Sequence, residues 1–322
     1  MKPPTGLRAL ALCGPTASGK SELASRLAQE VGGEVVNADS RQIYAGTRIG
    51  TGWPSDEQLA RAPHHGYGAL SPDERYSAGR FVSDARAQIA GIVARGRLPI
   101  VVGGTGLYIE ALAGSMPLDR PIADDALRER VRREAAVHPH AVLREWLETI
   151  APHAAARSAA GDRYRTLRAL EAALAEREDA FESRAQERGT ASAGPASRGR
   201  DYNVRLDIVV LDVPREQLDA RIGDRVRAMF ERGLVAEAQA IARSFPAAPA
   251  LTGIGYAEAL AYAGGLASRD EAVASTIKRT RAYAKRQRTW FRRIASATHI
   301  AALDPEALHA LITMARESAS AT

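Results

Sequence analysis

Residues 14–21, GPTASGKS, form a glycine-rich stretch that ends in a lysine and a serine. The apolar run RALALC at 8–13 precedes it, and apolar residues then recur at helical spacing. A strand, a glycine-rich loop of this spacing and a helix in succession predict a phosphate-binding loop. The loop consists of Gly14, Pro15, Thr16, Ala17, Ser18, Gly19, Lys20 and Ser21.

The residue types in this loop suit a bound diphosphate or triphosphate. Backbone N–H groups and the N-terminus of the following helix bind phosphate oxygens, because both carry partial positive charge. Lys20 adds a point charge, and the hydroxyl of Ser21 can hold Mg²⁺. A kinase, a motor and an enzyme that only discards pyrophosphate can all use such a loop, so other residues must identify the reaction.

Three further apolar runs predict strands, namely EVVNAD at 34–39, LPIVVGG at 98–104 and RLDIVVLDV at 205–213. Helical patterns separate them, and Ser77 is a candidate N-cap for one of these helices. Strands that alternate with helices predict a parallel sheet flanked by helices. The expected fold class is therefore α/β, with a P-loop NTPase-like sheet.

Residues 115–200 interrupt this alternation and are expected to form a mostly helical insertion, rich in Ala, Arg and Glu. Its tail, SRAQERGTASAGPASRGR at 183–200, is low in apolar residues and is expected to be a mobile loop or hinge. The catalytic core then comprises residues 1–114 and 201–322. Near its end, Ser268 and Glu271 form a capping-box pattern that predicts a long helix running to about Arg293.

The composition restricts the class of protein. The 322 residues include 44 Lys and Arg against 38 Asp and Glu, which gives a formal net charge of +6 and is compatible with a nucleic-acid partner. Cys13 is the only cysteine, which excludes a disulfide framework and a cysteine-based zinc site within one chain. No signal peptide or membrane-spanning run is recognisable, so a cytoplasmic protein is expected.

Candidate catalytic residues follow two predicted strands, at the edge where open α/β sheets bind ligands. Asp39 can accept a proton from an acceptor group, or it can simply stabilise the turn that follows it. Thr105 lies among glycines that either allow a ligand to approach the backbone or serve only the turn. Arg221 and Arg225 lie one helical turn apart and can reach a phosphate, although a solvated helix face is the alternative.

The segment KRTRAYAKRQRTWFRR at 278–293 has eight basic residues and no acidic one. Arginines and aromatic residues alternate along one helical face, at Arg279, Tyr283, Arg286, Trp290 and Arg293. Such a face suits a nucleic-acid backbone with occasional stacking on a base or ribose. The alternative is a basic, solvated helix whose aromatic side chains pack into the core.

His64 and His65 are adjacent and lack carboxylate or cysteine partners at metal-binding spacing. They are therefore expected to be structural or to contact substrate rather than to bind a metal ion.

Together these features resemble one family, the tRNA dimethylallyltransferases, also called tRNA isopentenyltransferases. The matching blocks are GPTASGKS, NADSRQIYAGTRIGTGWPS, APHH, YSAGRF, VVGGTGLYIEAL, RVRAMFERGL, GIGYAEAL and TRAYAKRQRTWFRR. They occur in the family's order across nearly the whole chain. The loop alone is generic, whereas the ensemble is specific.

The resemblance implies transfer of the five-carbon group of dimethylallyl diphosphate to the exocyclic amine of an adenosine. This adenosine lies immediately 3′ of the anticodon in tRNAs that read codons beginning with U. Asp39 would be the general base, and Arg225 would neutralise the leaving pyrophosphate. Thr16, Lys20 and Ser21 would contact the diphosphate, with Mg²⁺ bound through Ser21.

The resemblance also implies contacts with tRNA, and the basic segment adds two more. The residues concerned are Asp39, Ser40, Arg41, Gln42, Thr105, Arg128, Tyr164, Arg165, Arg168, Arg279 and Arg286. The helical insertion would grip the anticodon stem-loop, and the target base would flip into a channel that meets the diphosphate from the opposite side. The chain is expected to act as a monomer.

Two stretches depart from the family's pattern. Residues 162–165 read Asp-Arg-Tyr-Arg where the family commonly has Asp-Pro-Gln-Arg, which leaves the roles of Arg163 and Tyr164 open. After His64-His65 the chain continues with Gly66-Tyr67-Gly68 instead of apolar residues and an Asp.

Three other functions share parts of this sequence pattern. A small-molecule kinase could use Asp39 on a hydroxyl acceptor, and an adenylate isopentenyltransferase would act on a free nucleotide. The large insertion and the basic helix favour a macromolecular acceptor over both. A motor-type or non-catalytic RNA-binding ATPase needs a metal-binding Asp at the end of a central strand, where this chain has Gly103-Gly104-Thr105; Asp212, followed by Pro214, is the one alternative.

Overall fold

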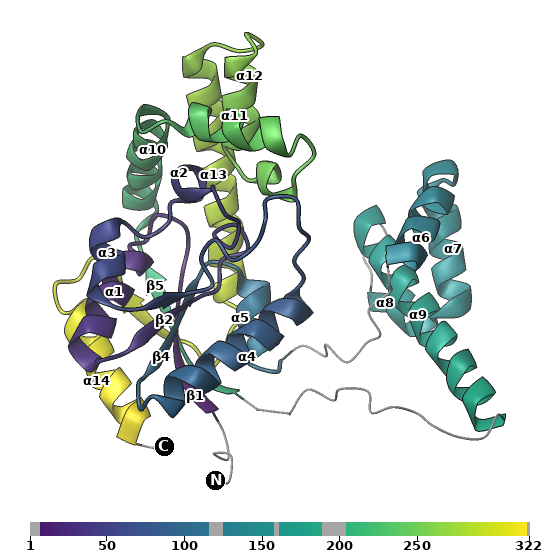
Figure 1. Cartoon of the computed structure of the whole chain (residues 1–322), viewed down its shortest axis with the longest axis horizontal. Coiled ribbons are helices and arrows are strands. Elements are labelled where there is room, and N and C mark those ends of the chain that lie inside the picture. Colours follow the sequence, from purple (N-terminus) through teal and green to yellow (C-terminus); the bar gives the residue numbers. More distant parts are fainter. Residues whose placement is uncertain (1–6, 116–124, 158–160, 189–203, 321–322) are drawn as a thin grey trace. The chain divides into compact units, whose positions relative to one another are not determined.

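The computed structural model describes residues 7–115, 125–157, 161–188 and 204–320. The chain divides into two compact units (Figure 1). One unit comprises Met1–Met116 and Arg200–Thr322, and the other comprises Pro117–Gly199. The first unit holds the β-sheet, and the second is helical in its described residues.

The sheet has six strands, in the order β3-β2-β4-β1-β5-β6, and each strand is parallel to its neighbours. They are β1 (Leu7–Cys13), β2 (Glu34–Asn37), β3 (His64–His65), β4 (Pro99–Gly103), β5 (Val204–Asp212) and β6 (Thr298–Ala301). Cys13 lies beside Gly103 on one side and Val210 on the other. The carboxyl ends of these three parallel strands therefore lie together, and the loops that follow them form the candidate site.

The four predicted strands are confirmed, although β2 ends at Asn37 rather than Asp39. Two short edge strands, β3 and β6, were not predicted. β3 has two residues and β6 is largely exposed, so neither produces an apolar run. The histidines of β3 make internal contacts, since His65 Nε2 lies 2.6 Å from Glu34 Oε2 and His64 Nδ1 lies 2.7 Å from Ala62 O, which favours the structural alternative.

Helices cover both faces of the sheet, with α1 and α14 on one face and α4 on the other (Figure 1). Buried side chains such as Leu10, Leu12, Ile100 and Val209 form the core between them. The helices of this unit are α1 (Lys20–Val31), α2 (Arg48–Thr51), α3 (Asp56–Arg61), α4 (Ala78–Ala94), α5 (Gly106–Leu112), α10 (Arg215–Glu231), α11 (Leu234–Ser244), the 3₁₀ helix η1 (Pro249–Thr252), α12 (Tyr256–Ala263), α13 (Arg269–Phe291) and α14 (Ala307–Ser320).

Two predicted helix starts are confirmed by their capping bonds. Ser77 accepts a hydrogen bond from Arg80 N at the start of α4, and Ser268 forms a capping box with Glu271 at the start of α13. The long helix, expected to run to about Arg293, ends at Phe291 with Arg292 as its C-cap. Helix ends are the least reliable part of such predictions, since they fray into turns.

The second unit contains α6 (Asp125–Val137), α7 (His140–Ile150), α8 (Pro152–Arg157) and α9 (Arg163–Arg188). Leu127, Leu143, Leu147 and Leu170 are buried in a core of its own. The predicted loop at 183–200 was wrong for residues 183–188, which continue α9 because Ala, Arg, Gln and Glu favour a helix. Residues 189–200 lie outside the described ranges.

Within the described ranges, no helix combines the length and the apolar composition needed to cross a bilayer.

Candidate active site

The glycine-rich loop joins β1 to α1 at the carboxyl edge of the sheet. Gly14 has a φ of 146°, and a Cβ there would lie 2.9 Å from the carbonyl oxygen of Leu211. Gly19 has a φ of 94° and is the N-cap of α1. Both positions therefore require glycine, and the backbone is compatible with the phosphate-binding loop that the sequence predicts.

A cavity of about 290 Å³ opens beside this loop. Lys20 and Ser21 line it from α1, and Arg221 and Arg225 line it from α10. Arg232, the C-cap of α10, also lines it, and Glu22 is the one carboxylate among its described lining residues. This excess of positive charge suits a polyanion such as a diphosphate.

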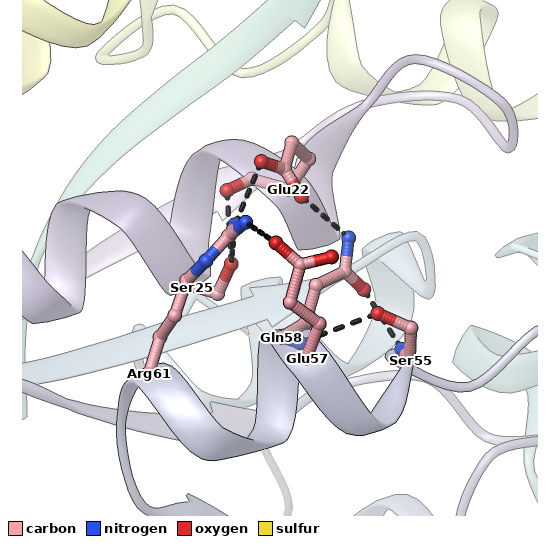
Figure 2. Close-up of polar contacts among 6 residues, drawn as sticks. All are labelled: Glu22, Ser25, Ser55, Glu57, Gln58 and Arg61. Carbon is pink, nitrogen blue, oxygen red and sulfur yellow. Dashed lines mark hydrogen bonds and ion pairs between the residues drawn. The ribbon is translucent and has the colours of Figure 1, made fainter.

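Glu22 belongs to a polar cluster that joins α1 to α3 (Figure 2). Its two carboxylate oxygens accept hydrogen bonds from Gln58 Nε2 at 2.8 Å and from Arg61 Nη1 at 2.7 Å. These bonds, with that of Gln58 contributing most, lower the pKa of Glu22. Gln58 also completes the capping box of Ser55 at the start of α3. Glu22 thus fixes α3 against the helix that carries Lys20.

Lys20 is held across the loop, where its Nζ donates a hydrogen bond to the carbonyl oxygen of Pro15 at 2.7 Å. Burial lowers the pKa of Lys20 to about 8, and the charge of Asp39 partly opposes this effect whereas the charge of Arg225 adds to it. A bound anion would favour the protonated amine and raise this pKa again. The lysine is therefore suited to respond to a diphosphate in the cavity.

The two arginines of α10 reach toward the loop. Arg225 Nη2 donates to Thr51 O at 3.1 Å, and Arg221 Nε donates to Ala17 O at 2.9 Å. Leu218, Ile222 and Val226 bury the apolar face of the same helix. Both arginines line the cavity, but Arg221 is exposed and Arg225 binds α2 rather than the loop. The alternative of a solvated face is therefore wrong for Arg225 only.

Asp39 follows β2 and lies at the same edge of the sheet. Asn37 binds the backbone around it, since Asn37 Oδ1 accepts from Asp39 N at 2.9 Å and Asn37 Nδ2 donates to Asp39 O at 3.2 Å. The carboxylate oxygen Oδ1 accepts from Arg41 N at 2.9 Å, which is the turn interaction expected of an Asp in this position. The charge of Asp39 also raises the pKa of Lys20 and of Arg225 against the larger effect of burial. Asp39 therefore stabilises its turn and also acts electrostatically on the cavity.

The residues after Asp39 have mixed surroundings. Ser40 N donates to Thr105 Oγ1 at 3.1 Å, which brings the loops after β2 and β4 together. Arg41 is exposed and donates to Thr252 Oγ1 at 2.7 Å. Gln42 is buried and its Nε2 donates to the carbonyl oxygens of Thr51 and Gly52, at 3.1 and 2.9 Å. This favours a structural role for the Gln42 side chain, whereas contacts of Ser40, Arg41 and Thr105 with RNA remain predictions.

The basic and aromatic residues of α13 do not all lie on one exposed face, as the sequence had suggested. Arg279 donates to the buried carboxylate of Glu258 at 2.5 Å, and the guanidinium of Arg286 lies 5.7 Å from the ring centroid of Tyr283. Trp290 packs on the turn after β4, because a Cβ on Gly106 would lie 2.3 Å from Trp290 Cδ1. The predicted stacking face is therefore wrong for Trp290, which is a packing residue, while Arg286 remains exposed.

In the helical unit, the first turns of α9 carry most of the predicted RNA contacts. Tyr164 is 69% exposed, and the guanidinium of Arg168 lies 5.9 Å from its ring centroid. Arg165 is exposed and its Nε lies 3.2 Å from Asp162 Oδ2. Arg128 lies half-buried on α6. Arg163 has an internal role, since its guanidinium donates to the carbonyl oxygens of Ala135 and His138 at the end of α6.

Sequence reasoning missed Gln287, which is buried on α13 at 5% exposure. Its Oε1 accepts from Thr16 N at 2.8 Å, and its Nε2 donates to Gly104 O at 2.8 Å. The side chain thus joins the phosphate loop to the turn before Thr105. A glutamine inside a run of basic residues gives no signal of burial, so the periodicity of apolar residues could not identify it.

Among the described residues, no group of three or more His, Cys, Asp or Glu side chains is arranged to hold a metal ion. A Mg²⁺ ion does not need such a group, because it commonly binds through one or two protein oxygens and the phosphates of a substrate. The hydroxyl of Ser21 lines the cavity beside Lys20 and fits this arrangement.

An open parallel sheet whose first strand leads through this loop into a helix defines a P-loop NTPase-like protein. More narrowly, the chain belongs to the IPP transferase family, whose model matches residues 42–294. The model of the isopentenyl transferases matches residues 7–64.

Three known proteins illustrate the similarity. The tRNA dimethylallyltransferase of Anaeromyxobacter dehalogenans is 44% identical over 304 residues, which cover 94% of this chain and 98% of that protein. The full-length tRNA isopentenylpyrophosphate transferase of Bacillus halodurans matches with a TM-score of 0.69 and 31% identity, over 98% of this chain and 97% of that one. A eukaryotic dimethylallyltransferase acting on tRNA matches with a TM-score of 0.78 over 98% of this chain and 80% of that one, and its 24% identity supports the fold alone.

Proposed function

We propose that this chain transfers the dimethylallyl group of dimethylallyl diphosphate to N6 of an adenosine in tRNA and releases diphosphate. The adenosine is the one immediately 3′ of the anticodon in tRNAs that read codons beginning with U. The observation that supports this most is the position of Asp39, which follows β2 at the same edge of the sheet as the phosphate loop but is not among the residues that line the cavity. A site for a leaving diphosphate thus adjoins a carboxylate that can serve the incoming nucleophile.

The diphosphate would lie in the cationic cavity, against the loop, Lys20 and Arg225. When the C1–O bond of the substrate breaks, the electron pair leaves with the diphosphate, and the cationic side chains stabilise this charge. The lone pair of adenine N6 forms the new bond to C1, and Asp39 accepts the N6 proton. The loop therefore serves a leaving group, and carbon rather than phosphorus is attacked.

Mg²⁺ is part of this proposal, and it would be held by Ser21 and by the oxygens of the diphosphate. When bound, it would neutralise negative charge on the leaving group as a Lewis acid. Lys20 and Arg225 would orient the same oxygens from the other elements of the cavity.

The tRNA would contact both units. In the helical unit, exposed Tyr164, Arg165 and Arg168 at the start of α9 offer an aromatic ring and guanidinium groups suited to the anticodon stem-loop. In the core unit, Ser40, Arg41, Thr105 and Arg286 would contact RNA near the reacting base. We propose that the chain acts in this way as a monomer in the cytoplasm.

One assay distinguishes this function from the others. The protein is incubated with bulk tRNA, Mg²⁺ and either dimethylallyl diphosphate labelled in the allyl group or ATP labelled in the γ-phosphate. We expect the allyl label to move to tRNA and to be recovered, after digestion, on N6 of one adenosine. Label on free AMP would indicate an adenylate isopentenyltransferase, and transfer of the phosphate label would indicate a kinase; either outcome would overturn the proposal.

The role of the helical unit needs a separate test. Replacement of residues 118–200 by a short linker is expected to leave pyrophosphate binding measurable, because the cavity lies entirely in the core unit. Affinity for tRNA should fall sharply in the same protein. If a folded truncated chain modifies tRNA with near-normal efficiency, the helical unit does not grip tRNA.

A further inference from the structure

Trp53 and Tyr67 form an aromatic pair beside the cationic cavity. Their ring centroids are 5.9 Å apart and their planes meet at 69°, which is an edge-to-face contact. Trp53 lines the cavity that contains Lys20 and Arg225, and it is the one aromatic residue among the described lining. A cavity built for a polyanion therefore has one large apolar wall, which a diphosphate alone does not need.

The surroundings of Trp53 fix its ring in place. A Cβ on Gly68 would lie 2.3 Å from Trp53 Cη2, so the indole lies directly against the backbone of this glycine. The indole Nε1 is buried and has no hydrogen-bond partner within the described residues. Packing therefore holds the ring, together with the guanidinium of Arg48, whose Cζ lies 5.8 Å from the ring centroid. Two residues after Trp53, Ser55 begins α3, which the Glu22 cluster joins to α1 (Figure 2).

The backbone that carries Tyr67 is held by residues of the candidate site. Asn37 Nδ2 donates to Gly66 O at 3.0 Å, and the same side chain binds the backbone of Asp39. Gly68 N donates to Gln42 O at 3.1 Å. Burial and the charge of Asp39 both raise the pKa of the Tyr67 hydroxyl. The aromatic pair therefore extends from the cavity for the leaving group toward the candidate base.

We propose that Trp53, with Tyr67 at its edge, forms the wall that binds the dimethylallyl group and limits the transferred chain to five carbons. This inference rests on the proposed function, because it assigns the alkyl part of the substrate to residues that no diphosphate contact requires.

The chemistry of the transfer gives the wall a second role. As the C1–O bond lengthens and its electron pair moves to the diphosphate, positive charge develops on the allyl group and is shared between C1 and C3. The new C1–N6 bond forms with the lone pair of the adenine amine, and the proton of that amine passes to Asp39. An aromatic face next to the allyl group attracts the transient positive charge and also excludes water, which would otherwise capture it.

The limit on the length of the transferred alkyl chain follows from the side chains that pack behind Trp53. Tyr67 packs against Trp53, and the ring of His64 lies 5.7 Å from that of Tyr67. The wall therefore has side chains behind it and cannot recede without repacking them. A ten-carbon allylic chain would need that space, whereas a five-carbon group would not.

The experiment compares ligands that differ only in their alkyl part. Binding of inorganic pyrophosphate and of the unreactive thio analogues of dimethylallyl and geranyl diphosphate is measured by calorimetry, with Mg²⁺ and without tRNA. The proteins are the wild type, Trp53→Ala, Trp53→Phe, Tyr67→Leu and the control Tyr262→Ala, which removes an exposed aromatic ring from α12. Each variant is first shown to be folded by circular dichroism and thermal melting.

In the wild type, the dimethylallyl analogue should bind about 10- to 100-fold more tightly than pyrophosphate, because it also buries alkyl surface. Trp53→Ala should lose most of this difference while its affinity for pyrophosphate changes less than about twofold, and Trp53→Phe should keep most of it. The ratio of geranyl to dimethylallyl affinity should rise at least about tenfold in Trp53→Ala and in Tyr67→Leu. The single-turnover rate in Trp53→Ala should fall about 2- to 30-fold beyond the effect on binding, the range of one cation–π contact.

The outcomes separate this inference from the function on which it rests. If folded Trp53→Ala keeps the full preference for the dimethylallyl analogue, the alkyl group binds elsewhere and the inference is wrong. If the wild type transfers no allyl label to tRNA, the proposed function fails instead. If it transfers the label but shows no preference for the dimethylallyl analogue over pyrophosphate, the inference alone is wrong. If Trp53→Ala does not fold, Tyr67→Leu decides, since an unchanged preference for the shorter chain in that variant overturns the limit on length.

Discussion

The side-chain oxygen of Gln287 accepts a hydrogen bond from the backbone N–H of Thr16 at 2.8 Å, across 271 positions of sequence. The amide nitrogen of the same side chain donates to Gly104 O, also at 2.8 Å. One N–H of the phosphate loop is thereby engaged by the protein itself. A buried residue of α13 therefore fixes the loop that would hold the diphosphate and the turn that leads to Thr105.

Gln287→Leu should lower the single-turnover rate by about 10- to 100-fold at saturating substrates, because it leaves a buried N–H and a buried carbonyl without partners. Thr289→Ala, two positions along the same helix and exposed, is the matched control and should keep the wild-type rate. Both are measured at 25 °C, well below the melting temperature of each protein. A folded Gln287→Leu protein with the wild-type rate would limit Gln287 to a role in stability.

Glu34 connects the start of β2 to the helix before β4. It is 2% exposed, and Arg95 donates to both of its oxygens while His65 Nε2 lies 2.6 Å from Oε2. The hydrogen bonds from Arg95, more than that from His65, lower the pKa of Glu34 to about 2 from an ordinary value of 4.5. The ionised carboxylate therefore stabilises the fold above the unfolded-state pKa, and this contribution is lost as the pH falls toward 2.

We expect Glu34→Gln to lower the free energy of unfolding by about 3 kcal/mol at pH 7, which is the linkage value of a shift of this size. The difference from the wild type should shrink steadily between about pH 5 and pH 3. Urea titrations at several pH values measure it. Glu57→Gln is the control, because that carboxylate is exposed and an exposed ion pair such as its pair with Arg61 contributes little to stability. A difference that stays constant with pH would contradict the assignment.

Much of the core unit could be predicted because its strands are buried and continuous. β4 is wholly apolar, and β1 and β5 contain the buried apolar runs 9–13 and 208–211, so these strands are recognisable in the sequence. The glycine-rich loop predicts the turn and the helix after β1. β3 and β6 could not be predicted, because a short or exposed edge strand has no face that must be apolar. These two strands form because the rest of the folded chain holds them against the sheet, and the local sequence does not show this.

The candidate site was predictable where a sequence pattern fixes the place of a residue. Asp39 follows a predicted strand, and Lys20 belongs to the phosphate-loop pattern. It was not predictable where a polar side chain is buried by a distant partner. Gln287 and Gln42 look like surface residues in the sequence, and only their partners in the fold reveal that they hold two loops in place. The same limit explains Trp290, whose position beside arginines suggested a stacking surface although it packs on Gly106.

Lys20 should make diphosphate binding depend on pH. Its pKa of about 8 in the free protein means that the amine is largely protonated at pH 7 and loses its charge as the pH rises past 8. The affinity for pyrophosphate should therefore fall between about pH 7.5 and pH 9.5. Lys20→Met should bind more weakly and lose this part of the pH dependence. Pyrophosphate's own titration affects both proteins equally, so an identical pH profile in the two would show that Lys20 does not titrate there.

Arg225 should affect turnover more than affinity for tRNA. It lines the cavity and donates to Thr51 O, which orients its guanidinium beside the proposed leaving group. Arg225→Ala should lower the single-turnover rate about 10²- to 10³-fold, the scale of one preorganised donor, and Arg225→Lys should recover only part because an ammonium lacks the planar fork. Arg227→Ala is the control, since Arg227 is exposed on the same helix and pairs with Asp224. An unchanged rate in Arg225→Ala would remove this residue from the transition state.

Asp39 is the residue on which the proposed mechanism depends most. The exocyclic amine of adenine is a poor nucleophile, because its lone pair is delocalised into the ring, so its attack on carbon benefits from a base. Asp39→Asn removes the basic oxygen, yet the amide oxygen can still accept the hydrogen bond from Arg41 N and preserve the turn. The substitution therefore tests the charge and the proton acceptor separately from the turn.

We expect Asp39→Asn to lower the single-turnover rate by about 10²- to 10⁴-fold, the usual scale for loss of a general base. Affinities for tRNA and for dimethylallyl diphosphate should each change by less than about tenfold. The measurements belong at pH 7, because Asp39 helps to keep Lys20 protonated and its loss would weaken diphosphate binding at higher pH. Asn37→Ala, which removes the side chain that holds the Asp39 backbone, should lower the rate less and should shift the pH profile little. A wild-type rate in Asp39→Asn would leave Asp39 as a turn residue, and lost tRNA binding with a normal saturated rate would make it a recognition contact.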